Sequence, residues 1–226
     1  MLLMGRRLLI RSTSLPYHLY GRSNNKEWFY LPKQEVWEIL VKLIGETTIS
    51  LGLRVHAFVL MSNHYHLLAT TSDPENSVDR VMCRLLKKAS DQINHRANRI
   101  NHVFGGPYKW SLIRTPHHYE HVLRYVYQNP VRSKICRFVE EYPFSTLSYE
   151  GKGENILQVS RHIFESDLHH KLNQKSINFL DWLNEEYDEE HVEAMRRALY
   201  RREFKFLPHR LTKKLPHQFR SLEISA

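Results

Sequence analysis

The segment from His56 to Thr71, HAFVLMSNHYHLLATT, constrains the fold more than any other part of the chain. Two apolar runs flank the polar pair Ser62-Asn63, which predicts two antiparallel strands joined by a tight turn. Side chains alternate between the faces of a strand, so His64 and His66 leave the same face with Cα atoms roughly 6.5–7 Å apart. Two imidazoles at this spacing can converge on one metal ion, although a polar strand face that happens to hold two histidines has the same pattern.

The composition indicates a folded, basic protein. Its 226 residues are 42% hydrophobic and 12% aromatic, enough to bury a core in one domain with an extension or in two small domains. The net charge of +9 favours nucleic acid as the partner and an anionic membrane surface as the second choice. Cys83 and Cys136 have no zinc-site spacing and indicate a reducing compartment. No apolar run reaches the roughly 20 residues that span a bilayer, so we expect no membrane partner. Arg6 and Arg7 interrupt the first apolar run, so we expect no signal peptide and a cytoplasmic protein.

Periodicity along the chain predicts an alternation of strands and helices around this hairpin. We expect a strand at residues 15–22, a glycine loop that becomes a strand within residues 104–114, and helices at residues 34–50, 78–100 and 115–129. In the first strand, His18 and Tyr20 share one face. The order strand, helix, hairpin, helix, strand, helix predicts an α+β fold with an antiparallel sheet, compatible with a ferredoxin-like core.

Three basic segments are candidates for contact with nucleic acid. The loop at residues 21–26 offers amide and cationic donors, and the polar face of the 78–100 helix is basic. In the 104–114 strand, aromatic and basic residues interleave, which suits stacking on unpaired bases. The plainer interpretations are a solvated turn, a solvated helix face and an irregular core strand. The candidate DNA-binding residues are Arg22, Asn24, Asn25, Lys26, Arg84, Lys87, Lys88, Tyr108, Lys109, Trp110, Arg114 and Arg132.

The helix at residues 115–129 carries a second set of reactive side chains. Tyr125 and Asn129 are four positions apart and therefore lie on one edge of the helix, whereas Tyr127 points to the other flank. A tyrosine hydroxyl can attack phosphorus, but with a pKa of about 10 it needs a metal ion or a nearby base. His121, one turn before Tyr125, is a candidate to assist its proton or contact phosphate. His18 is a candidate neighbour of the site, or a packed histidine.

The two sets together describe a chemically sensible metal site. The amide oxygen of Asn129 is a hard third ligand beside the neutral imidazoles of His64 and His66. This set suits Mg²⁺ or Mn²⁺, which would polarise a phosphate oxygen as a Lewis acid.

The C-terminal third differs in character from the rest. From about residue 160 the sequence is helical in pattern, and residues 181–193 hold seven acidic residues without Lys or Arg. The segment from Arg196 to Arg220 then holds nine Lys and Arg and one acid, Glu203. This tail is expected either to hold DNA electrostatically or to fold back on the acidic segment. We therefore expect a catalytic domain at residues 1–150 and a helical, basic extension at residues 151–226.

Five motifs, in order over about residues 8 to 150, resemble the single-tyrosine transposases of the HUH endonuclease superfamily. HAFVLMSNHYHLL resembles their HUH strand pair, and YVYQNPVRSKI resembles the catalytic helix of the REP-associated branch. LPYHLYGRSNNK is similar to the first strand and loop of that branch, FGGPYKW to its aromatic-basic strand, and YPFSTLSY to the block after its catalytic domain.

The resemblance implies a ferredoxin-like HUH fold and a metal-dependent endonuclease and strand transferase. The implied substrate is single-stranded DNA beside a REP-type hairpin, cut through a 5′-phosphotyrosine intermediate. Tyr125 takes the place of the nucleophile, and His64, His66 and Asn129 take the places of the Mg²⁺ or Mn²⁺ ligands. The assembly is expected to be a monomer or a homodimer. The alternative is a non-catalytic protein that keeps this fold and binds DNA or RNA hairpins.

Overall fold

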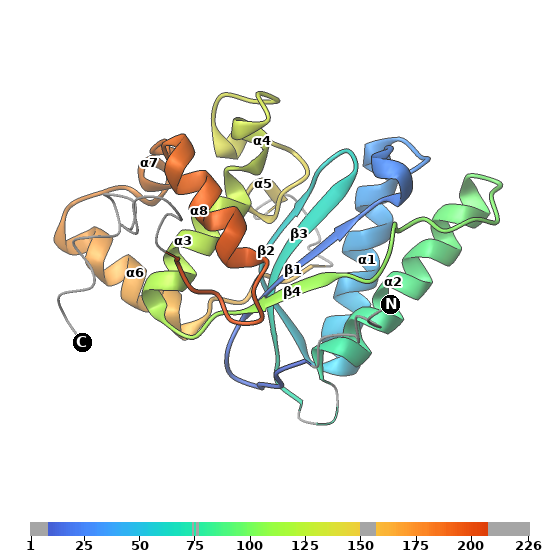
Figure 1. The fold of residues 1–226 in the computed structure, drawn as a ribbon, viewed down its shortest axis with the longest axis horizontal. Helices are drawn as coiled ribbons and strands as arrows, with labels where there is room; N and C mark the ends of the chain where they lie inside the picture. The colour runs from blue at the N-terminus through green and yellow to red at the C-terminus, as the bar shows by residue number, and fades with distance from the viewer. Residues whose placement is uncertain (1–8, 74, 76, 150–156, 208–226) are drawn as a thin grey trace, which may run out of the picture.

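The protein is built on a four-stranded antiparallel sheet with the strand order β2-β3-β1-β4 (Figure 1). The computed structural model describes residues 9–73, 75, 77–149 and 157–207. The strands are β1 (Tyr17–Arg22), β2 (Leu53–Leu60), β3 (His64–Thr71) and β4 (Lys109–Leu112). The tight turn of the β2–β3 hairpin is closed by a hydrogen bond from Met61 N to His64 O, at 2.8 Å.

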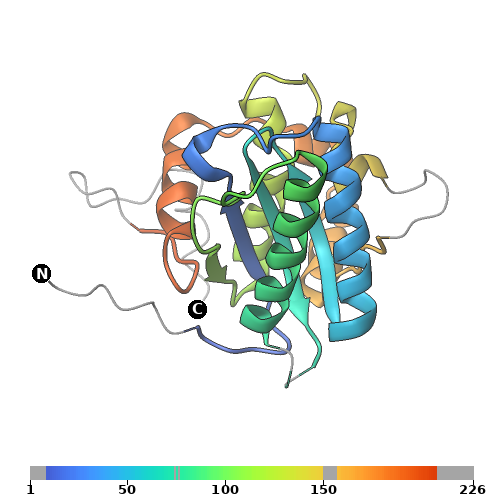
Figure 2. The same ribbon diagram turned by 90° about the vertical axis from the view of Figure 1, so that its right-hand side faces the viewer.

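Two long helices, α1 (Lys33–Leu51) and α2 (Val78–Arg96), cover one face of the sheet side by side (Figures 1 and 2). Their buried stripes pack with Tyr17, Leu19 and Leu67 of the sheet in one apolar core. Gly52 caps α1 with φ +66°, a left-handed conformation that glycine adopts without strain. The short 3₁₀ helix η1 (Asn24–Lys26) follows β1.

The opposite face of the sheet is covered by α3 (Pro116–Tyr127). Thr115 caps this helix, because its side chain accepts a hydrogen bond from the backbone N–H of His118. After a break at Gln128 the chain remains helical as α4 (Asn129–Arg132), with Pro130 in its first turn. Two short elements, η2 (Val139–Glu141) and α5 (Thr146–Tyr149), follow.

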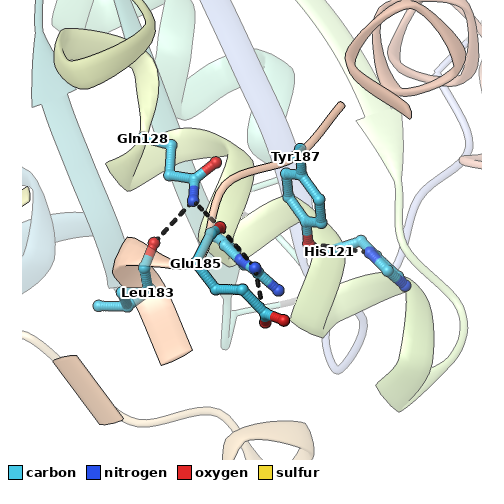
Figure 3. Close-up of polar contacts among 6 residues, drawn as sticks. His121, Gln128, Leu183, Glu185 and Tyr187 are labelled. Carbon is cyan, nitrogen blue, oxygen red and sulfur yellow. Dashed lines mark hydrogen bonds and ion pairs between the residues drawn. The ribbon is translucent and has the colours of Figure 1, made fainter. Parts of the chain in front are cut away.

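The C-terminal extension is helical and packs against α3. It contains α6 (Ile163–Gln174), α7 (Phe179–Asn184) and α8 (Glu189–Leu199). Gln128 Nε2 donates to the carbonyl oxygens of Leu183 and Glu185 at 2.8 and 2.7 Å, and His121 Nδ1 pairs with the Tyr187 hydroxyl at 3.0 Å (Figure 3). The extension is therefore attached to the helix that carries Tyr125.

After α8 the extension returns to the sheet. Leu112 N donates to Arg202 O, and Phe204 N donates to Leu112 O, each at 2.8 Å. A salt bridge of 2.6 Å joins Arg114 and Glu203 beside these bonds. Residues 202–204 thus run along the outer edge of β4, and they fix the end of α8 near that strand.

The α+β class, the strand order of a ferredoxin-like core and the helical extension confirm the sequence predictions. Several predicted boundaries were wrong. The strand expected within residues 104–114 covers only Lys109–Leu112. The helix expected to reach Ile100 ends at Arg96, because Asn98 takes a left-handed φ of +50°. The helix expected to reach Asn129 ends at Tyr127, and α4 then accommodates Pro130 because a proline in a first helical turn has no hydrogen bond to lose. The segment 150–156 and the basic tail beyond residue 207 lie outside the described residues. Within the described residues, no helix is long and apolar enough to cross a bilayer.

Candidate active site

The site is laid out on the face of β1 and β3 that points toward α3. Tyr20 pairs with His66 across the two strands, and Arg22 pairs with His64. Directly opposed residues lie on the same face of an antiparallel pair, so all four side chains share one surface. Their ring centroids are 5.1–5.6 Å apart for the pairs Tyr20–His64, Tyr20–His66 and His64–His66.

Helix α3 lays Tyr125 against this surface. The Tyr125 ring stands edge-on to His66, with centroids 5.8 Å apart, and is 6% exposed. Asn129, the first residue of α4, lies one turn further on, and its Nδ2 donates to the backbone oxygen of Tyr125 at 2.9 Å. The Arg132 guanidinium lies over the Tyr125 ring, 4.0 Å from its centroid. The strand histidines and the helix tyrosine therefore meet, although they are about sixty positions apart in the sequence.

These side chains line a cavity of about 250 Å³ that is strongly positive. Among the described residues, four that line it are cationic and none is a carboxylate. Such a cavity favours a polyanion such as a DNA backbone. The lining residues are His18, Tyr20, Arg22, His64, His66, Lys109, Tyr125, Asn129, Arg132, Ser133, Arg196, Leu199 and Tyr200.

A hydrogen-bond chain sets the tautomer of His64. Asn63 Nδ2 donates to Lys26 O at 2.7 Å, so Asn63 Oδ1 is the atom that faces the His64 ring. His64 Nδ1 lies 2.7 Å from this oxygen and must donate to it. The proton of the neutral ring is then on Nδ1, and Nε2 keeps the lone pair that a metal ion requires.

His66 has a histidine for its partner. Its Nδ1 lies 2.8 Å from His18 Nε2, and both rings are 3% exposed. If His66 Nδ1 donates to His18, then His66 Nε2 is also a free ligand atom, as in the hydrogen-bonded histidines of metal sites. His18 was a possible neighbour of the site in the sequence; the structure places it in the cavity wall.

The imidazoles are held in the neutral form. Burial lowers the pKa of His18 to about 3. Burial, reinforced by the positive charges of Arg22 and Arg132, lowers the pKa of His64 to about 4. The pKa of His66 is well below its usual value, first because of burial and then because of the neighbouring His18, His64, Arg132 and Arg22. All three rings are therefore neutral at neutral pH, with one N–H and one nitrogen that keeps its lone pair, the state in which histidine binds metals.

The residues fit a Mg²⁺ or Mn²⁺ ion held by few protein ligands. Asn129 Oδ1 accepts a hydrogen bond from Arg132 Nη2 at 3.0 Å and keeps a second lone pair. Among the described residues no three His, Cys, Asp or Glu side chains are grouped to hold a metal, so the two imidazoles would share the ion with the amide and with oxygen atoms of water or substrate.

Arg132 has hydrogen-bond donors that are available to a ligand beside Tyr125. Its Nε and Nη1 are buried without a hydrogen-bond partner in the described part of the chain. Burial lowers the pKa of Arg132, the opposing effect of Tyr125 being smaller. Unpaired guanidinium N–H groups beside a tyrosine hydroxyl are suited to a phosphate oxygen.

Tyr127, the other tyrosine of α3, points away from the cavity. Its hydroxyl is buried and pairs with Thr146 Oγ1 at 3.0 Å. The helix phase inferred from the sequence therefore separates the two tyrosines correctly.

The other predicted residues lie in several places. The short helix η1, made of Asn24, Asn25 and Lys26, lies beside the turn of the β2–β3 hairpin. Its Asn24 N donates a hydrogen bond to Val103 O. Tyr108 and Trp110 line a second, larger cavity next to the first, and Lys109 lines both. The exposed basic residues of α2, Arg84, Lys87 and Lys88, lie on the far side of the sheet from Tyr125, and Lys88 is paired with Glu46. Their contact with DNA stays a prediction.

His121 does not line the cavity. It is engaged by the extension through Tyr187, and its ring packs against His117 and His191. Its expected assistance to the proton of Tyr125, or contact with phosphate, stays a prediction. Arg114 is likewise tied to Glu203 of the extension.

Sequence reasoning missed the contribution of the extension to the site. Arg196, Leu199 and Tyr200 come from α8 and its end, and Tyr20 and Ser133 were also not selected. Tyr20 had a signal, because strand alternation puts it on the face of His18. Arg196 had one in the basic segment that begins with it, whereas Leu199 and Tyr200 had none, since nothing local shows which surface this part of the chain covers.

Comparison with known families decides the identity of the chain. The family model described as "Transposase IS200 like" matches residues 11–129, which is 119 of the 226 residues. The chain belongs to this family. DNA binding and DNA transposition are therefore its family-level function, and the matched region carries His64, His66, Tyr125 and Asn129.

A solved structure agrees with this IS200-like transposase in fold. A REP-associated tyrosine transposase bound to a REP hairpin aligns at 18% identity with a TM-score of 0.55, covering 70% of this chain and 93% of the other. A putative transposase from Deinococcus radiodurans R1 aligns at 13% identity over 62% of this chain and 98% of the other, but its TM-score of 0.37 is too low to support an argument. No curated protein matches the sequence.

Proposed function

We propose that this IS200-like transposase is a metal-dependent endonuclease and strand transferase that cuts single-stranded DNA beside a REP-type hairpin. Tyr125 is the nucleophile, and His64, His66 and Asn129 hold Mg²⁺ or Mn²⁺. The observation that carries the proposal is the contact of the Tyr125 ring with His66, 5.8 Å between centroids, on the sheet face that also holds His64. The catalytic domain is proposed to span residues 1–150.

The reaction is a transesterification at phosphorus. The Tyr125 oxygen forms a bond to phosphorus, the bond from phosphorus to the 3′ oxygen breaks, and that oxygen takes up a proton as a free 3′-hydroxyl. The phenolic proton leaves to solvent. Attack of a 3′-hydroxyl on the 5′-phosphotyrosine reverses these changes and rejoins a strand. A bound divalent ion would polarise the phosphate oxygen and favour ionisation of a hydroxyl near it.

The chain's own residues position the phosphate. Arg132, with its unpaired N–H groups over the tyrosine, is placed to bind a non-bridging oxygen as charge develops. Arg22, Lys109 and Arg196 hold the neighbouring phosphates through charge. Burial of Tyr125 between His66 and Arg132 keeps bulk water from the ester.

The test uses a labelled hairpin oligonucleotide with randomised single-stranded flanks, incubated with the protein and Mn²⁺. A covalent protein–DNA adduct that disappears with a chelator is expected. Tyr125→Phe should form none and still bind DNA, whereas the matched control Tyr127→Phe, whose hydroxyl pairs with Thr146 away from the cavity, should form it. Equal loss in both variants would contradict the assignment of the nucleophile.

The alternative function is a hairpin-binding protein without catalysis, on DNA or RNA. The positive cavity alone would serve such a protein. It predicts tight hairpin binding with no adduct under any metal condition, and a ribose-containing hairpin bound more tightly would assign RNA.

A further inference from the structure

We propose that the groove beside the catalytic cavity, with one wall made by the C-terminal extension, binds the unpaired nucleotides next to the cleaved phosphate. This inference rests on the proposed function and names the part of the substrate that the extension contacts. The groove has a volume of about 730 Å³. One wall comes from residues 107–110 at the start of β4, and the other from residues 199–202 at the end of α8.

The groove and the catalytic cavity are adjacent. Lys109, Leu199 and Tyr200 line both, so a strand lying in the groove would run beside the cavity that holds Tyr125. The groove walls carry Arg11, Lys109 and Arg202 against one acid, and that acid, Asp79, is paired with Arg11 at 3.7 Å. Two cations therefore remain for phosphates along the path.

Aromatic side chains accompany these cations. Tyr200 is 60% exposed, and Lys109 Nζ lies 4.5 Å from the centroid of its ring. Across the groove lie Tyr108 and Trp110, both half-buried. An exposed ring beside cations, such as Tyr200 beside Lys109, is a surface on which proteins stack single-stranded nucleic acid, because every base has a π-face and every nucleotide a charge. A duplex has its bases already stacked and offers no such partner.

The position of Tyr200 is fixed by the fold rather than left to a loose tail. On its C-terminal side, residues 202–204 bond to Leu112 at the edge of β4. On its N-terminal side, α8 follows Tyr187 and Glu185, which are bonded to His121 and Gln128 of the α3 segment (Figure 3). The backbone that carries the ring is therefore already ordered, which lowers the ordering cost of binding a base.

The test measures the affinity for a fluorescent oligo(dT) of about twelve nucleotides, a length within single-strand site sizes, by anisotropy. Loss of one stacked base costs about 1–3 kcal/mol, so Tyr200→Ala should weaken binding roughly 5- to 150-fold. Tyr200→Phe keeps the ring and should bind as the wild type. Phe138→Ala is the matched control. Phe138 is also exposed, and the Arg137 guanidinium lies 5.1 Å from the centroid of its ring, but it is not among the described residues that line either cavity.

Heparin and oligo(rU) of the same length distinguish base stacking from charge alone, and DNA from RNA. Tyr200→Ala should leave heparin affinity unchanged, because heparin has charge and no bases. A weakening of heparin binding equal to that of oligo(dT), or oligo(dT) affinity equal in Tyr200→Ala and Phe138→Ala, would overturn the proposal. Tighter, Tyr200-dependent binding of oligo(rU) would overturn its assignment to DNA. None of these readouts needs strand cleavage, so a failure of catalysis at Tyr125 would leave this result interpretable.

Discussion

The hydrogen bond between His18 and His66 gives a sharp prediction about metal binding. For His66 to offer Nε2 to a metal, its proton must lie on Nδ1, and the acceptor 2.8 Å away is His18 Nε2. His18→Phe keeps a ring in the wall but removes that acceptor. The buried N–H of His66 then loses its partner, a penalty of about 1–3 kcal/mol that favours moving the proton to Nε2.

The expected result is a loss in affinity for Mn²⁺ of about 10- to 100-fold, the usual effect of removing a hydrogen-bond partner from a metal-binding histidine. His18→Gln should recover most of it, because the Gln Oε1 reaches about as far as Nε2 and accepts a hydrogen bond. Mn²⁺ titrations followed by the electron paramagnetic resonance signal of the free ion measure this without strand cleavage.

His56→Phe is the matched control. His56 is another buried histidine of the sheet, 3% exposed, whose ring bonds Thr70 and Ser160 and does not line the cavity. It should lower the melting temperature and leave the affinity for Mn²⁺ unchanged. Wild-type affinity in His18→Phe, or an equal loss in His56→Phe, would refute the assigned tautomer.

Two further predictions concern stability. Burial lowers the pKa of His56 to about 4, so between about pH 6.5 and pH 4 the unfolded chain binds a proton at this ring and the folded chain does not. The free energy of unfolding should therefore decrease as the pH is lowered across that window. Melting temperatures of His56→Gln, measured over the same pH range, should lose this part of the pH dependence, and an unchanged dependence would count against the buried neutral ring. Gly21→Ala should lower the free energy of unfolding, measured by chemical denaturation, by about 1–3 kcal/mol, because the added Cβ would overlap Cε1 of Tyr65 on the opposing strand. A Gly21→Ala protein as stable as the wild type would mean that the Tyr65 ring moves aside freely.

The central part of the site could be predicted from the sequence because it depends on local geometry. Strand alternation puts His64 and His66 on one face, and helix phase separates Tyr125 from Tyr127. The role of His18 requires the β1–β3 register, in which His18 stands opposite Leu68, one pleat from His66. A shift of one residue would turn His18 to the other core, and no local pattern fixes that register.

The basic residues of α2 show a second limit. Amphipathic periodicity identified the solvent face of α2 correctly, with Arg84 and Lys87 exposed and Leu85 buried. It does not say which face of the sheet the helix covers. Both helices that cross over between strands, α1 and α2, lie on one face, and α3, which follows the last strand, lies on the other. Residues of α2 and α3 are therefore separated by the sheet.

The charge of the cavity leads to a last prediction, that metal and DNA bind cooperatively. The ligand atoms of His64, His66 and Asn129 are neutral, and the cavity holds four cations without a carboxylate. Unit charges of like sign 4 Å apart repel by about 1 kcal/mol in water and about 4 kcal/mol at an effective dielectric constant of 20. A divalent ion alone should therefore bind weakly, and a phosphate that pairs with Arg132 should strengthen its binding.

Linkage requires the effect to be mutual. In the Tyr125→Phe protein, saturating oligo(dT) should raise the affinity for Mn²⁺ by about 5- to 150-fold, the range of coupling free energies of 1–3 kcal/mol, and Mn²⁺ should raise the affinity for oligo(dT) by the same factor. Arg196→Gln should strengthen Mn²⁺ binding in the absence of DNA, whereas Arg137→Gln, which removes a cation outside the cavity, should not. Mn²⁺ affinity independent of DNA would mean that the ion and the phosphate do not share this cavity, and the cations of the wall would then serve DNA binding alone.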